Sequence, residues 1–138
     1  MQMTSDEPAS SAQGGDDGRP AYDYPTGPCV ACEALGRLTD DATLVSSPFA
    51  AGIVWSGSGV EGSAAVVPRR HVMSMFELTD AELKDLASVT RATVRVIEER
   101  YAARGMSISW DAGVSAGQRE PHLVIHVVPR KMQSDDER

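Results

Sequence analysis

The sequence predicts an α+β domain with five short strands and one long helix. Five apolar segments separated by turn residues predict the strands, and apolar residues at helical spacing after Thr79 predict the helix. The length of 138 residues suits one domain, with 41% hydrophobic and 24% charged residues in an ordinary globular balance. Only 5% of the residues are aromatic, so the core is modest and a bound metal ion would help to stabilise it.

The chain divides into three segments by composition. Residues 1–27 are rich in Ser, Gly, Asp, Gln and Pro, and such a segment cannot bury enough apolar surface to offset its ordering entropy. We predict a disordered acidic tail over 1–27, a folded domain over 28–130 and a flexible C-terminal tail over 131–138.

The net charge of −7 argues against nucleic-acid binding, which needs a basic face. Much of the acidic excess lies in residues 1–27, so the folded part can still bind an anion locally. No apolar segment is long enough to span a membrane, and no secretory signal is visible. We expect a cytoplasmic protein with neither nucleic-acid nor membrane partners.

The first half of the domain is predicted to form a short helical turn and three strands. The turn covers Ala31–Leu38, and the strands cover Ala42–Ser46, Ala50–Trp55 and Gly62–Val67. The Gly- and Ser-rich segment 56–59 predicts a hairpin loop between the second and third strands, and Pro68 is expected to end the third. Arg69 and Arg70 are interpreted as a solvated turn, since paired exposed charges are common.

The long helix has start and stop signals. Thr79 and Glu82 form a capping-box pattern, in which each side chain bonds the backbone N–H of the other. The apolar stripe that follows consists of Leu83, Leu86, Ala87, Val94, Ile97 and Tyr101. Gly105 is expected to end the helix in the left-handed conformation. The last two strands are predicted over Met106–Trp110 and His122–Val128.

Two cysteines indicate a metal site. Cys29 and Cys32 form a C-x₂-C pair, the spacing at which two thiolates bind one metal ion. A closed zinc site needs two more ligands, and the chain contains His71, His122 and His126. An extended strand would separate His122 from His126 by about 13 Å, which makes it awkward for both to reach one ion. The residues predict Cys29, Cys32, His71 and one strand histidine, and spacing leaves that last choice open.

Residues 29–130 resemble the histidine-triad (HIT) superfamily. Residues 111–130, DAGVSAGQREPHLVIHVVPR, are similar to its signature, roughly N-x-G-x-x-A-G-Q and then H-x-H-x-H-x-x-P-R. Residues 66–72, VVPRRHV, resemble the turn that precedes the long helix in the family, and the C-x₂-C pair matches the zinc knuckle of zinc-bearing bacterial members.

The resemblance implies a fold and a metal site. The fold would be HIT-like, a five-stranded antiparallel sheet with one long helix and a short N-terminal zinc knuckle, dimerised through helix and sheet. The zinc ligands would be Cys29, Cys32, His71 and His122, and the zinc would be structural because a Cys₂His₂ set is normally closed.

The resemblance also implies that the family nucleophile is missing. The middle histidine of the triad attacks a phosphate in the family, and its position here is Val124, which has no lone pair for covalent catalysis. The other predicted ligand-binding positions are Asp111, Gly117, Gln118 and Arg119. Asp111 replaces an asparagine that helps to hold phosphate, and Arg119 could offset its charge. The acidic residue that binds ribose in the family has no counterpart near Trp55.

His126, the third triad position, is the remaining candidate for catalysis. Its reference pKa of about 6.5 suits acid/base chemistry, although a histidine that is merely hydrogen-bonded fits the sequence equally well. The sequence favours a recruited enzyme that acts on a small anionic or phosphorylated metabolite. The alternatives are a non-catalytic module that binds a nucleotide or another ligand, and a residual nucleotide phosphoramidate or dinucleotide hydrolase that uses water as nucleophile.

Overall fold

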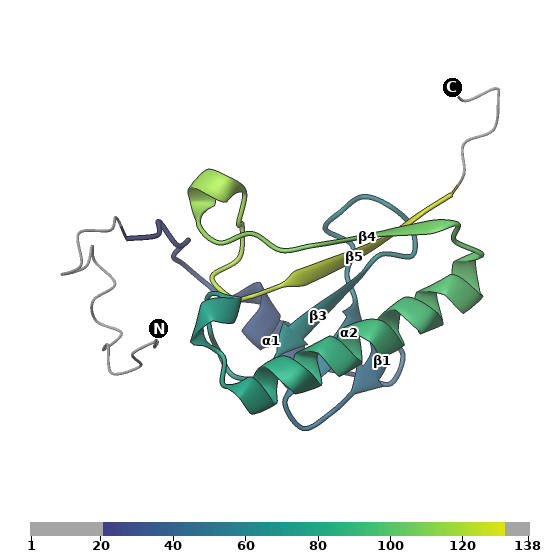
Figure 1. Cartoon of the computed structure of the whole chain (residues 1–138), viewed down its shortest axis with the longest axis horizontal. Coiled ribbons are helices and arrows are strands. Elements are labelled where there is room, and N and C mark those ends of the chain that lie inside the picture. Colours follow the sequence, from purple (N-terminus) through teal and green to yellow (C-terminus); the bar gives the residue numbers. More distant parts are fainter. Residues whose placement is uncertain (1–20, 132–138) are drawn as a thin grey trace.

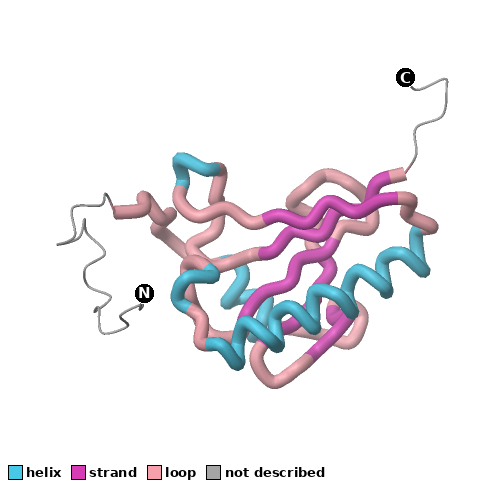
Figure 2. Tube along the Cα trace, viewed as in Figure 1, coloured by secondary structure: helices cyan, strands magenta, loops and turns pink. Residues whose placement is uncertain are grey.

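The computed structural model describes residues 21–131 and shows an α+β domain in which one long helix lies along a sheet (Figures 1 and 2). The elements are α1 (Val30–Gly36), β1 (Thr43–Ser46), β2 (Ala50–Val54), β3 (Ala64–Pro68), η2 (Met75–Glu77), α2 (Asp80–Tyr101), β4 (Gly105–Ser109), η3 (Val114–Ala116) and β5 (Ile125–Arg130). The predicted fold class, with five strands and one long helix, is confirmed. Of the predicted tails, residues 1–20 and 132–138 lie outside the described part.

The five strands form one antiparallel sheet in the order β1-β2-β3-β5-β4. The last strand in the chain therefore lies inside the sheet, between β3 and β4. His126 on β5 pairs with Ala65 of β3 on one side and with Ser109 of β4 on the other. This topology places the third triad histidine in the middle of the sheet.

Helix α2 covers one face of the sheet, and the main core lies between them. Leu86, Val89 and Ile97 from the helix pack in this core with buried residues of β3 and β5. The helix approaches β2 so closely that a methyl group at Gly52 would overlap the buried Thr93 hydroxyl. Within residues 21–131, no helix combines the length and the apolarity needed to cross a bilayer.

A second, smaller core lies on the opposite face of the sheet, under α1. It contains Ala31 of α1 together with Ala51, Ile53, Ala65, Val67 and Val124. Because side chains alternate along a strand, β2 and β3 contribute to both cores. This second face carries the candidate functional site.

The start of α2 was predicted correctly and its end was not. Both hydrogen bonds of the capping box are present: Thr79 Oγ1 accepts from the Glu82 N–H, and a Glu82 carboxylate oxygen accepts from the Thr79 N–H. The helix ends at Tyr101, and Ala102 adopts the left-handed conformation with φ of 52°. Gly105, the predicted stop, is the first residue of β4, because the Arg104 N–H already pairs with the Arg130 carbonyl at the sheet edge.

Two strand boundaries also differ from the prediction. The last strand was predicted from His122 but begins at Ile125, because the N–H of Leu123 donates to the Val72 carbonyl at 2.7 Å and keeps this part of the chain against another loop. Strand β3 includes Pro68 instead of ending before it. The predicted alternation still holds, since Leu123 packs in the main core and Val124 in the second one.

Candidate metal centre and adjoining pocket

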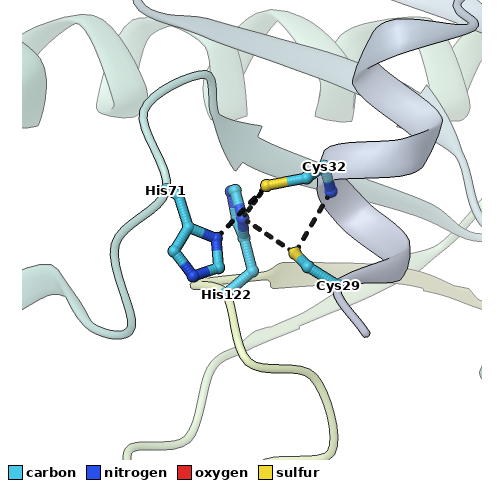
Figure 3. A group of neighbouring side chains, drawn as sticks. All are labelled: Cys29, Cys32, His71 and His122. Atoms are coloured by element: carbon cyan, nitrogen blue, oxygen red, sulfur yellow. Dashed lines mark hydrogen bonds between the residues drawn. The ribbon is translucent and has the colours of Figure 1, made fainter. Parts of the chain in front are cut away.

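The four predicted metal ligands meet in space (Figure 3). Cys29 and Cys32 come from the start of α1, His71 from the loop after β3, and His122 from the loop before β5. One ligand atom from each lies within 4.8 Å of the others, so the group could hold a metal ion. His122, and not His126, is the strand-side histidine of this cluster, as the family resemblance implied.

The spacing of the donor atoms fits a tetrahedral ion. The Sγ atom of Cys32 lies 3.2 Å from His71 Nδ1 and 3.5 Å from His122 Nδ1, and Cys29 Sγ lies 3.4 Å from His122 Nδ1. With metal–sulfur and metal–nitrogen bonds of about 2.3 and 2.0 Å, tetrahedral sulfur and nitrogen ligands are about 3.5 Å apart. Two thiols and two imidazoles at these distances are a donor set that suits zinc.

Local hydrogen bonds orient the ligands. Cys29 is the N-cap of α1, and its Sγ atom accepts from the Cys32 N–H at 3.2 Å, which brings the two sulfurs onto one side of the turn. The fully buried His122 ring lies with Nε2 2.9 Å from the Pro68 carbonyl oxygen. Because a carbonyl can only accept, Nε2 carries the proton and the Nδ1 lone pair faces the sulfurs.

Without a metal ion, the electrostatics of the cluster favour neutral side chains. Burial and the neighbouring Cys29 thiol raise the pKa of Cys32 to about 11. Burial also lowers the pKa of His122, against the opposing effect of its bond to the Pro68 carbonyl. Both shifts disfavour ionisation of the bare side chains, and a divalent ion would supply the positive charge that stabilises thiolates here.

Arg69 and Arg70 lie in an exposed turn, as predicted, and their side chains also bond to other elements. Arg69 donates to the Ser47 carbonyl at 2.9 Å and to Ser46 Oγ at 2.7 Å. Arg70 forms a two-pronged ion pair with Glu82, both contacts at 2.9 Å. The sequence contained no separate sign of the ion pair between Arg70 and Glu82, because the capping box already accounted for a glutamate at position 82.

A pocket of about 530 Å³ adjoins the metal cluster on the α1 face of the sheet. Its lining includes all the predicted ligand-binding and catalytic residues, namely Asp111, Gly117, Gln118, Arg119, Val124 and His126. His122 and Val30 line it as well, so the cluster and the pocket share a wall. Trp55 both packs against the second core and lines the pocket.

Val124 and His126 lie next to each other in this pocket and differ in character. Val124 is 6% exposed and belongs to the second core, so its side chain fills space in addition to facing the pocket. His126 is half-buried, and burial lowers its pKa. The charge of Arg119 lowers the pKa of His126 further, while the carboxylates Asp111 and Glu120 raise it. A ring with a lowered pKa is neutral near pH 7 and can accept a proton.

Gln118 organises the loop that carries the pocket residues. It is buried, its Oε1 atom accepts from the Gly113 N–H at 2.7 Å, and its Nε2 donates to the carbonyls of Met73 and Glu120 at 3.1 and 2.9 Å. The N–H groups of Gly117 and Gln118 donate to carbonyls within the same turn. The side chain of Gln118 therefore reaches the backbone of the loop, and the ligand-binding role predicted for it stays a prediction.

Sequence reasoning missed one residue that contacts this loop, Asp23, which lies before α1. Its carboxylate accepts from the N–H and the hydroxyl of Ser115, its carbonyl accepts from the Val114 N–H at 2.8 Å, and the bonds from Ser115 lower its pKa. Gly113 has a φ of +100°, and any side chain there would collide with Asp23. No local pattern signals a contact between residues 92 positions apart.

Comparisons with known proteins agree with this architecture. A family model of the HIT domain matches residues 42–133. The chain is 40% identical over 70 residues to the asymmetrical bis(5'-nucleosyl)-tetraphosphatase of Schizosaccharomyces pombe, covering 51% of this chain and 38% of that protein. It is 39% identical over 70 residues to the AP-4-A phosphorylase of Mycobacterium tuberculosis, covering 50% and 36%. The chain thus spans less than two fifths of either relative.

A solved structure shows the same fold. A hypothetical histidine triad nucleotide-binding protein from Sulfolobus tokodaii superposes with a TM-score of 0.70 at 24% identity, covering 77% of this chain and 71% of that one. The antiparallel sheet with one long helix and a histidine-bearing inner strand defines the class of the protein as an α+β domain of the histidine-triad type. With the family model matching most of the described residues, the chain belongs to the HIT family.

Proposed function

We propose that this HIT-family protein binds a small anionic or phosphorylated metabolite and acts on it by acid/base chemistry of His126, without a covalent intermediate. The observation that carries the proposal is the juxtaposition of Arg119, His126 and Val124 in one pocket. Arg119 offers a cation to an anionic group, His126 offers a neutral imidazole, and Val124 offers no nucleophile. Two relatives are named as a bis(5'-nucleosyl)-tetraphosphatase and an AP-4-A phosphorylase, and these names support a phosphate-bearing ligand.

The pocket is large enough for such a ligand. A volume of about 530 Å³ lies within the range of small-molecule sites, roughly 300–1,000 Å³. Its lining includes apolar side chains, among them Val30, Val54 and Trp55, and polar ones, among them Ser109 and the charged residues. A ligand with an apolar part and an anionic part matches this mixed lining.

His126 would act as the general base or acid. Burial and Arg119 lower its pKa, so the neutral ring can take a proton from a bound water or a substrate hydroxyl near pH 7. The nearby Asp111 and Glu120 carboxylates would stabilise the imidazolium that forms. Covalent nucleotidyl transfer requires a lone pair at residue 124, which valine does not have.

The metal in this proposal is a structural zinc ion held by Cys29, Cys32, His71 and His122. When bound, the ion would join the N-terminal turn to the loops around β3 and β5, stabilising the wall that the cluster shares with the pocket. Four protein ligands leave no open coordination position, so we assign no catalytic role to the metal. A homodimer, expected from the resemblance, is also part of the proposal.

A second candidate is a binding module without catalysis. It is favoured by the burial of Val124 in the second core, which gives the floor of the pocket an apolar, space-filling character. In this case the ligand would bind beside His126 and leave unchanged. A ligand that binds the folded state raises the melting temperature by mass action in either case.

The deciding experiment is a thermal-shift screen of phosphorylated and other anionic metabolites, followed by mass-spectrometric analysis of each ligand that raises the melting temperature. We expect an altered product with the wild type and none with His126→Ala, which should keep its zinc and its melting temperature. Full turnover by His126→Ala would exclude the acid/base mechanism. Recovery of the ligand unchanged from the wild type would favour the binding module.

A further inference from the structure

We propose that Arg70 and Glu82 are positioning residues of the metal centre, which hold His71 in place for coordination although neither is a ligand. The inference rests on the metal centre proposed above. Its starting point is the exposed position of His71 in the loop between β3 and η2. The contacts of its ring are to Cys32 and His122, which belong to the cluster itself, so the placement of its backbone depends on the neighbouring residues.

The neighbour on one side is fixed to the long helix. Arg70 Nε and Nη2 each donate to a different oxygen of Glu82, both at 2.9 Å, and Nη2 also donates to the Glu77 carbonyl at 2.9 Å. A planar guanidinium bound to both oxygens of a carboxylate has a defined orientation as well as a defined distance. The chain immediately before His71 is therefore attached to the first turn of α2.

Glu82 is itself a rigid anchor. Its side chain is 8% exposed in the first turn of the helix, and it also accepts from the Thr79 N–H at 2.9 Å to complete the capping box. The Arg70 guanidinium and the Thr79 N–H lower the pKa of Glu82 to about 2, so the carboxylate is charged near neutral pH. The anchor thus lies in the capped first turn of the longest helix.

Val72, the neighbour on the other side, is bound to the residue that follows His122. Val72 is buried, and its carbonyl accepts the Leu123 N–H at 2.7 Å, immediately after His122. The two imidazole rings lie with their centres 5.2 Å apart. His71 therefore lies between two contacts, one of Arg70 to the helix and one of Val72 to the loop of His122. The first is made by side chains and the second by the backbone, so only the first can be removed by substitution.

A pre-positioned ligand binds metal more tightly, because less conformational freedom is lost on binding. Residues that orient metal ligands typically change affinity by about 10- to 100-fold when they are substituted. If the ion pair only stabilised the start of α2, its loss would lower the melting temperature without changing the affinity of the folded protein for metal. The two roles are therefore separable by experiment.

Arg69 provides a matched control. It is the adjacent residue, is also exposed, and makes two side-chain hydrogen bonds, one to Ser46 and one to Ser47 at the end of β1. Arg69→Gln removes a charge and these two bonds, neither of which involves α2. Glu82→Gln keeps an oxygen for the capping box and removes the charge, and Arg70→Lys keeps the charge and removes the two-pronged geometry.

The test is a titration of the full-length apo protein and its variants with Co²⁺, read by its visible absorption, and with Zn²⁺ against a chromogenic chelator. Circular dichroism would show that each protein is folded at the temperature used. We expect Glu82→Gln and Arg70→Lys to bind both ions about tenfold more weakly than the wild type. The Arg69→Gln protein should stay within twofold.

Two results would overturn the proposal in distinguishable ways. If the wild type and Glu82→Gln bound Co²⁺ equally while the variant melted at a lower temperature, the ion pair would be a stabilising contact only. If the wild type itself gave no thiolate-to-cobalt absorption, the metal centre would be wrong and the positioning role with it. Should Glu82→Gln fail to fold, Arg70→Lys supplies the same comparison with a smaller perturbation.

Discussion

The metal cluster and the pocket share His122 but differ in what the chain supplies to each. In the cluster all four ligand side chains are present and lie within 4.8 Å of one another. In the pocket, the position that the family resemblance assigns to the nucleophile is Val124, which packs into the second core. The difference shows that the two sites meet separate requirements. A metal cluster loses its ion when any one ligand is lost, whereas a core position accepts an apolar side chain and retains the fold.

The comparison predicts its largest effect for Cys32→Ser. Serine is a poor zinc ligand, and structural zinc sites contribute on the order of 10 kcal/mol of binding free energy that is coupled to folding. We expect the purified variant to contain no stoichiometric zinc by elemental analysis and to melt well below the wild type. The control is His126→Ala, which should keep one zinc ion per chain. Retention of zinc by Cys32→Ser would contradict the four-ligand assignment.

Val124→His would place an imidazole at the position that the family resemblance assigns to the nucleophile. Because a polar ring would enter a packed apolar core, we expect a loss of about 1–3 kcal/mol in the free energy of unfolding. We expect no covalent adduct with a nucleoside phosphoramidate, since Asp111 and the residues near Trp55 also differ from what the family resemblance implies for phosphate and ribose binding. Intact-protein mass spectrometry measures the adduct directly. Its appearance would mean that the pocket differs from a nucleotidyl-transferring site by one residue only.

Arg119→Ala is expected to weaken the binding of an anionic probe such as adenosine monophosphate. Arg119 is exposed, so solvent screens its charge and the loss should be about tenfold or less. Isothermal titration calorimetry at low and moderate salt would measure it, and the difference from the wild type should shrink with salt. Arg91→Ala, on the helix at the other face of the sheet, should bind as the wild type does. Equal affinity of the wild type and both variants for the probe would show that Arg119 does not contribute to anion binding.

The smallest predicted effect is a pH dependence of stability due to His126. Burial lowers its pKa in the folded state below 6.5, so the unfolded chain binds more protons just below that pH. The contribution of His126 to stability is then complete above pH 6.5 and is lost as the pH falls from 6.5 toward the folded pKa. Because the ring is only half-buried, we expect a small difference, roughly 1–3 °C in melting temperature.

Melting temperatures at pH 7.5 and 5.5, for wild type and His126→Gln with zinc bound, would test this. The melting temperature of the wild type should fall more on acidification than that of the variant, because only the wild type has the half-buried ring at position 126. Both proteins carry the same metal cluster, so its effect cancels. An equal loss in the two proteins would show that the His126 pKa is not lowered.

Much of the fold was predictable because its signals are local. The capping box of Thr79 and Glu82 began the helix where expected, since both partners lie within one turn. The end of the helix was not predictable from Gly105, because the position of β4 at the sheet edge required the chain to turn at Ala102. The start of β5 was missed for the same reason, a backbone bond between Leu123 and Val72 that no local pattern shows.

The candidate site, like the fold, has features that the sequence predicts and features that it does not. The ligand types were readable from the C-x₂-C pair and the histidines, and the family resemblance supplied the choice of His122 over His126. The supporting contacts were not readable. The ion pair of Arg70 with Glu82 and the bond of Asp23 to Ser115 join residues 12 and 92 positions apart.

The sequence by itself determined the chemical inventory: two thiols and three imidazoles, one arginine beside the triad, and a valine that cannot attack phosphate. Only the tertiary structure decided which of these groups meet. It joined the cysteines to His71 and His122, and it placed His126 between Ala65 and Ser109 on the sheet. The physical reason is that side-chain chemistry is fixed by residue type, whereas proximity depends on backbone pairing and packing between distant segments.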